Sequence, residues 1–199
     1  MQRSLRLLTV FLATTLVLVP GAFAQCVSGT ITSELMTTGP FTGLWKYTLQ
    51  ITWDLPQGLS NVALQCNFAC GSAICDSDWS FDTPSGSGDG ILSDEGTPGE
   101  CMVDFAGEFL CNGNAQQNLE GPTIKWDALD GGACEAGPTG SATICFFVDL
   151  PPEQGNSPVI LIKNGQQVCE GTVQGDCPSC PVAVEAASWS KVKDLYLLH

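Results

Sequence analysis

Hydrophobic and polar residues alternate strictly between residues 43 and 54. One parity carries aromatic and branched side chains, and the other carries polar ones. The apolar set is Trp45, Tyr47, Leu49, Ile51 and Trp53, and the polar set is Lys46, Thr48, Gln50, Thr52 and Asp54. Alternation with a period of two predicts a β-strand with one face buried. Because such a face needs a second layer to cover it, the aromatic row is expected to lie in a core.

Shorter runs of the same kind predict further strands. They cover residues 29–37, 61–66, 101–111, 122–127 and 141–150. Gly107, inside the predicted strand at residues 101–111, is expected to mark a bulge or a turn. Asn164-Gly165 separates residues 158–163 from residues 166–173, and Asn-Gly supplies the positive φ angles of a tight hairpin. A β-hairpin is therefore predicted there.

The connections between these runs are rich in Gly, Pro, Ser and Asp, and residues 83–100 form the longest predicted loop. Apolar residues at the spacing of a helix occur only near the end of the chain, beyond Pro178 and Pro181. They are Val192, Leu195 and Tyr196. The predicted fold is all-β, an antiparallel β-sandwich of the immunoglobulin-like or jelly-roll-like kind. The predicted domain covers residues 25–180, and residues 181–199 form a C-terminal tail, either helical or a sorting segment.

The first 24 residues have the pattern of a secretory signal peptide. A basic head with Arg3 and Arg6 precedes an apolar run over residues 7–19, which is short for a membrane span. Ala22-Phe23-Ala24 follows, so cleavage is expected after Ala24. The chain is thus expected to be secreted, at the cell surface or outside the cell, with no membrane span after cleavage.

Eleven cysteines in an exported chain predict a disulfide framework of four or five bridges. A redox role for the Cys177-x-x-Cys180 pair lacks a thioredoxin-like βαβ context, and a zinc site lacks nearby histidine. The odd count leaves one thiol free or shared between two chains. The disulfide candidates are Cys26, Cys66, Cys70, Cys75, Cys101, Cys111, Cys134, Cys145, Cys169, Cys177 and Cys180.

The charge balance restricts the partners. The formal net charge is −14, and it becomes −16 once the two arginines of the signal peptide are removed. Phosphate binding needs clustered Lys and Arg, so nucleic acid and anionic membrane surfaces are not expected partners. The single histidine is His199, which excludes Ser-His-Asp and Cys-His catalysis. Lys46, Lys125 and Lys163 alternate with apolar residues and are expected to face solvent.

Two sites are candidates for ligands. Asp76, Asp78, Asp82 and Asp89 lie in or beside a Gly/Ser-rich stretch and predict a calcium site, because calcium prefers carboxylate and carbonyl oxygens on loops. The alternative is a solvated acidic loop, and no other cofactor is expected. Trp79 is flanked by acidic and hydroxyl residues, so it is predicted to be exposed for stacking on a sugar ring.

Several motifs together resemble uncharacterised cysteine-rich secreted proteins of uncultured environmental bacteria. They are the strand at residues 45–54, the cysteines at 66–75, the Cys-x-Val-x-Phe-x-Gly-x-Phe-x-Cys segment at 101–111 and Ile-Lys-Trp at 124–126. The tail at residues 188–196 is similar to a Trp-x-x-(apolar)-Lys-x-Leu-Tyr ending in such proteins, with Ser190 where Gly is usual. The resemblance implies a secreted β-sandwich and brings no activity with it.

These observations favour a secreted, non-enzymatic structural or binding module. The first alternative is a calcium-dependent carbohydrate-binding domain, with an extracellular glycan or a cell-surface component as partner. The second is a small hydrolase that uses two carboxylates, as glycoside hydrolysis requires.

Overall fold

A computed structural model describes residues 26–66, 71–93, 96–131, 133–153, 158–164 and 167–179. Within these ranges the chain forms strands and two short 3₁₀ helices, with no α-helix. The 3₁₀ helices are η1 (Gly71–Asp76) and η2 (Ala115–Gln117). The strands are β1 (Val27–Leu35), β2 (Trp45–Asp54), β3 (Asn61–Gln65), β4 (Trp79–Ser80), β5 (Gly86–Ile91), β6 (Cys101–Leu110), β7 (Thr123–Leu129), β8 (Glu135–Ala136), β9 (Thr139–Val148), β10 (Pro152–Glu153), β11 (Val159–Asn164), β12 (Gln167–Gly175) and β13 (Cys177–Pro178).

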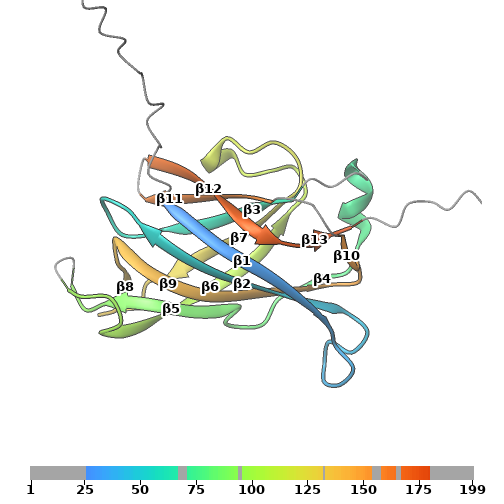
Figure 1. Cartoon of the computed structure of the whole chain (residues 1–199), viewed down its shortest axis with the longest axis horizontal. Coiled ribbons are helices and arrows are strands. Elements are labelled where there is room, and N and C mark those ends of the chain that lie inside the picture. Colours follow the sequence, from blue (N-terminus) through green and yellow to red (C-terminus); the bar gives the residue numbers. More distant parts are fainter. Residues whose placement is uncertain are drawn as a thin grey trace, which may run out of the picture.

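Nine of these strands close into a barrel. Their order is β9-β2-β1-β12-β11-β3-β7-β6-β5, and β5 also pairs with β9. Figure 1 shows the two walls of this barrel, one with β1, β2 and β9 and the other with β3, β7 and β6. The all-β, disulfide-bonded class predicted from the sequence is confirmed. The sandwich is replaced by a closed barrel, and the sheet is not purely antiparallel because β1 and β12 pair in parallel.

Closure depends on a strand that the sequence did not predict. β5 lies inside residues 83–100, which were expected to be a loop, and it pairs with β6 on one side and β9 on the other. Glycine at alternate positions of β5 allows β5 to lie close to β9. A Cβ at Gly88 would lie 2.5 Å from the Cβ of Ala142. A sequence of Gly, Ser and Asp has no apolar periodicity, so the pattern gave no strand signal.

The predicted aromatic row of β2 does face the core. Tyr47, Leu49, Ile51 and Trp53 are buried, and Trp45 is half-buried. The Tyr47 hydroxyl donates to the Leu150 carbonyl at 3.0 Å, and the Trp53 indole N–H donates to the Gly137 carbonyl at 2.9 Å. Burial raises the pKa of Tyr47, and the negative charge of Asp176 adds to the effect.

Gly107 does not form a bulge. It remains in β6 opposite Trp126, and a Cβ there would lie 2.3 Å from the Phe81 ring. Its amide donates to the Ser85 hydroxyl at 2.9 Å. Glycine is therefore needed at this position because an aromatic ring packs directly on the backbone.

The predicted hairpin arms are confirmed. β11 and β12 pair antiparallel from Val159↔Thr172 to Asn164↔Gln167. The turn residues Gly165 and Gln166 lie outside the described residues, as do the predicted signal peptide and the tail at residues 181–199.

Four disulfides join distant parts of the described chain. The pairs are Cys26–Cys169, Cys66–Cys177, Cys75–Cys111 and Cys101–Cys134. Cys145 is a free, half-buried thiol in β9, whereas Cys70 and Cys180 lie outside the described residues. Burial raises the pKa of Cys145, and the negative charge of Asp82 adds to this effect. The two bridges with sequence separations of 143 and 111 tie the first strands to the last ones.

The structure does not place Lys125 in solvent. It was predicted to face solvent, but its side chain is only 10% exposed. Its ammonium lies 2.7 Å from Asp127 and 3.1 Å from Glu108, which balances the charge. Burial acts to lower the pKa of Lys125, while hydrogen bonds and charge from the two carboxylates act to raise it, and the net shift is upward.

Candidate functional site

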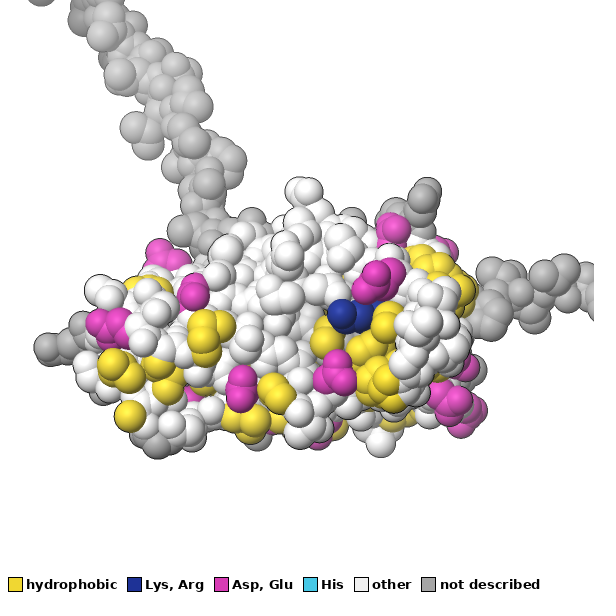
Figure 2. Space-filling model, turned by 90° about the horizontal axis from the view of Figure 1, so that it is seen from below, with side chains coloured by type: hydrophobic (Ala, Val, Ile, Leu, Met, Phe, Trp, Pro, Cys, Tyr) yellow, Lys and Arg dark blue, Asp and Glu magenta, His cyan; other side chains and the backbone are white. Residues whose placement is uncertain are grey.

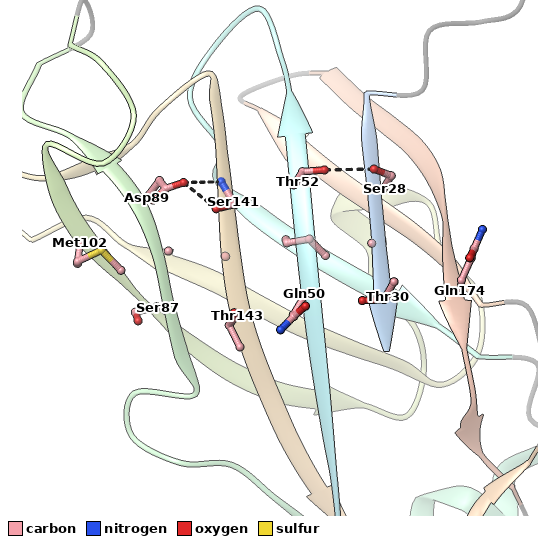
Figure 3. A pocket seen from close by; sticks show the side chains of 14 residues that line it. Ser28, Thr30, Gln50, Thr52, Ser87, Asp89, Met102, Ser141, Thr143 and Gln174 are labelled. Carbon is pink, nitrogen blue, oxygen red and sulfur yellow. Dashed lines mark hydrogen bonds between the residues drawn. The ribbon is translucent and has the colours of Figure 1, made fainter. Parts of the chain in front are cut away.

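The outer face of one barrel wall carries a groove, which we call the five-strand groove. It crosses β12, β1, β2, β9 and β5, with Met102 of β6 at its rim, and encloses about 700 Å³. Its floor is strand backbone with small or apolar residues, among them Gly29, Gly88 and Ala142. The polar side chains above this floor belong to the alternate residues of each strand that point out of the barrel (Figure 3).

One row of side chains crosses all five strands, and we call it the Gln50 row. The strand register places its members directly opposite one another, since Gln174 pairs with Thr30, Thr30 with Gln50, Gln50 with Thr143, and Thr143 with Ser87. Ser87 is half-buried and the other four are exposed. Within the described part of the chain, none of these five side chains makes a hydrogen bond. The row therefore offers hydroxyl and amide groups that have no protein partner there.

A parallel row, the Ser141 row, is bonded within itself. It contains Ser28, Thr52, Ser141 and Asp89, which Figure 3 shows beside the Gln50 row. The Ser28 and Thr52 hydroxyls lie 3.1 Å apart. Asp89 Oδ2 accepts from the Ser141 amide at 3.0 Å and from the Ser141 hydroxyl at 2.7 Å. These bonds hold the Asp89 carboxylate in one orientation at the β5 end of the groove.

The groove is nearly free of charge. Among the described residues that line it, Asp89 is the single ionisable side chain, and no Lys or Arg is present. Over the face drawn in Figure 2, acidic side chains outnumber basic ones. Neutral hydroxyl and amide groups dominate the polar side chains of the groove lining.

The structure does not bring the four predicted calcium ligands into one cluster. Asp76 ends η1, Asp78 precedes β4, Asp82 follows β4, and Asp89 belongs to β5. Asp76, Asp78 and Asp82 are exposed, whereas Asp89 is held by Ser141 in the groove. Across the described ranges, no group of three or more His, Cys, Asp or Glu side chains forms a metal-binding cluster. Calcium binding stays a prediction.

Trp79 is not the exposed ring that its neighbours in the sequence predicted. It is half-buried, and its ring stacks on Phe109 with a centroid distance of 4.0 Å and an interplanar angle of 4°. Its indole N–H donates to the Ile74 carbonyl at 3.0 Å. β4, which contains Trp79, pairs with the end of β9 beyond the segment that β5 pairs with. β4 therefore pairs with a part of β9 that β5 does not reach.

Sequence reasoning missed the groove as a site, although part of its signal was visible. The alternating polar residues between positions 46 and 54 were recognised as the solvent-facing side of a strand. Its alignment with hydroxyl and amide residues of four other strands depends on long-range pairing. β5, which supplies Ser87 and Asp89, was expected to be a loop.

Comparison with known proteins assigns no family to this chain. The sequence matches no protein-family model. It also has no significant match among curated proteins. Within the described ranges, no helix has both the length and the apolar character required to cross a membrane.

Proposed function

We propose that this protein is an exported, non-enzymatic binding module whose ligand-binding surface is the five-strand groove. The observation that carries the proposal is the Gln50 row, in which five neighbouring strands present hydroxyl and amide groups along one line. Hydroxyl and amide groups that have no protein partner can exchange water for hydrogen bonds to a polar ligand.

The disulfides support the export part of this proposal. Disulfides persist in oxidising compartments and are rare in the cytosol of most organisms. The pattern of residues 1–24 gives the same indication.

The chemistry of the groove supports binding over hydrolysis. Glycoside hydrolysis requires a pair of carboxyl groups on opposite sides of the scissile bond. Asp89 is the one carboxylate among the described residues that line the groove, and Ser141 already donates two hydrogen bonds to it. A carboxylate held in this way is suited to orient a ligand.

A binding assay with blocked variants tests the proposal. Labelled protein is sedimented with a neutral polysaccharide gel, an anionic polysaccharide gel and an extracellular-matrix protein gel. The double substitution Gln50→Ile/Thr143→Ile fills the row with branched aliphatic side chains, and isoleucine is well tolerated at strand positions. Thr32→Ile is the matched control, because Thr32 is an exposed outward residue of β1 outside the groove lining.

We expect wild-type protein and Thr32→Ile to be retained on at least one gel and the double variant to be lost from it. Retention of the double variant at the wild-type level, or no retention of wild-type protein on any gel, would overturn the assignment of the groove as a binding surface.

A further inference from the structure

We infer that the ligand of the five-strand groove is a neutral oligosaccharide or polysaccharide chain that lies across the strands, along the Gln50 row. This inference rests on the proposed binding function and adds the chemical class and the direction of the ligand. Three properties of the groove carry it: its length, its hydrogen-bonding groups and its charge.

The length of the row suits a chain of sugars. Neighbouring strands in a sheet lie about 4.8 Å apart, so a row across five strands extends over about 19 Å. Gln174 of β12 stands at one end and Ser87 of β5 at the other. This distance is too long for a single sugar ring and accommodates several consecutive rings.

The hydrogen-bonding groups match a polyhydroxylated ligand. The two glutamine amides and three hydroxyls of the row each provide both a donor and an acceptor, as do sugar hydroxyls. Four of the five side chains are exposed, and the five have no hydrogen-bond partner among the described residues. The Ser141 row beside them is bonded within itself through the Ser28–Thr52 and Asp89–Ser141 bonds, which hold its side chains in place.

The charge selects for a neutral glycan. A uronate-containing or sulfated chain needs Lys or Arg as counter-charge, and the described lining contains neither. Asp89 adds one negative charge at the β5 end, which repels an anionic chain and accepts hydrogen bonds from neutral hydroxyls. Its Oδ1 atom accepts no hydrogen bond from the described residues.

A polypeptide ligand fits the groove less well. Peptides that bind sheets commonly pair with an open edge strand, whereas the groove lies on the face of strands that are paired on both sides within the barrel. Protein interfaces depend on buried aromatic or Arg anchors, and the described lining has no aromatic ring and no Arg. The groove therefore lacks both features that hold a protein partner.

Affinity electrophoresis tests the inference with defined polymers. The full-length protein is run through gels that contain hydroxyethyl cellulose, galactomannan, arabinoxylan or mannan as neutral chains, and alginate or chondroitin sulfate as anionic chains. The variants are Thr30→Ala and Gln50→Ala/Thr143→Ala, with Thr32→Ala as the matched control on the same strand and face. All four positions but Gln50 carry threonine, and all are exposed, so stability is expected to be unchanged.

We expect retardation by at least one neutral polymer and by neither anionic one. Each lost hydrogen bond should weaken binding about fivefold, and the double variant about 25-fold. Thr32→Ala should bind like wild-type protein.

Other results would overturn the inference in distinguishable ways. Groove-dependent retention by an anionic polymer or by the matrix protein gel would reject a neutral glycan and leave the binding module in place. Neutral-polymer binding that Thr30→Ala and the double variant leave unchanged would reject the groove itself. No retardation by any neutral polymer would also reject the inference.

Discussion

Substitution of Gly88 by alanine tests the role of β5 in closing the barrel. A Cβ at position 88 would lie 2.5 Å from the Cβ of Ala142, 2.7 Å from the carbonyl oxygen of Ser141 and 2.9 Å from the Cα of Ala142. Non-bonded carbon atoms prefer separations of about 3.5–4.0 Å, so β5 and β9 must move apart by about 1 Å. These contacts involve backbone and Cβ atoms, and a change of rotamer cannot relieve them.

The energetic cost follows from this displacement. Overpacking in a well-packed site typically costs about 1–3 kcal/mol. A shift of about 1 Å also lengthens the N–H···O bonds of the β5–β9 seam beyond the usual range. We expect the Gly88→Ala variant to lose about 2 kcal/mol of unfolding free energy, which lowers the melting temperature by about 4–8 °C in a domain of this size.

Urea unfolding of the oxidised protein measures this loss, and amide hydrogen exchange locates it. Exchange should accelerate at the β5–β9 seam. Gly131→Ala is the matched control, because a Cβ there meets only the Leu129 carbonyl oxygen, at 3.9 Å. A Gly88→Ala variant as stable as wild-type protein, or a Gly131→Ala variant that is equally destabilised, would refute the argument that backbone contact at Gly88 permits closure.

Three further predictions concern other parts of the fold. Replacing Cys101 and Cys134 together by serine opens a loop with a sequence separation of 33, and we expect a loss of about 4 kcal/mol in urea unfolding; an unchanged midpoint would contradict this. Since the folded-state pKa of Lys125 is raised, its stabilising effect is present below the unfolded-state pKa and is lost as the pH rises through the folded-state value. The urea midpoint of wild-type protein should therefore fall more steeply above about pH 10.5 than that of Lys125→Met, and parallel curves would exclude this linkage. Burial raises the pKa of Cys145, so its reaction with a disulfide reagent at pH 8 should be slower than in the urea-unfolded chain, and equal rates would show that the thiol is not protected.

The sequence predicted the features that depend on local pattern. The alternation in β2 identified both the strand and its buried face, because neighbouring side chains of a strand point to opposite sides. The Asn164-Gly165 turn signal predicted the β11–β12 hairpin, whose arms pair in the described residues. Cysteine density in a chain with an export pattern predicted disulfides, which are present in the described residues.

The exposure of particular side chains was less predictable. Trp79 has polar neighbours in sequence, yet it stacks on Phe109 from another strand. Lys125 alternates with apolar residues like a solvent-facing lysine, yet Glu108 and Asp127 enclose its ammonium. Phe109 and Glu108 both lie on β6, so the local pattern around Trp79 or Lys125 contains no information about them. Asp127 lies two residues from Lys125 on β7, but its contact with the ammonium was not anticipated.

The sequence by itself determined the all-β class, the core face of β2, the hairpin and the low positive charge. Only the tertiary structure decided that the sheet closes into a barrel, which cysteines pair, and that five polar strand faces align in one groove. The physical reason is the range of the interactions. A strand pattern is set by residues two positions apart, whereas β5 closes the barrel through backbone pairing with β9, more than fifty residues away. Gly86 and Gly88 permit this pairing because they lack side chains, and absent side chains leave no hydrophobic pattern in the sequence.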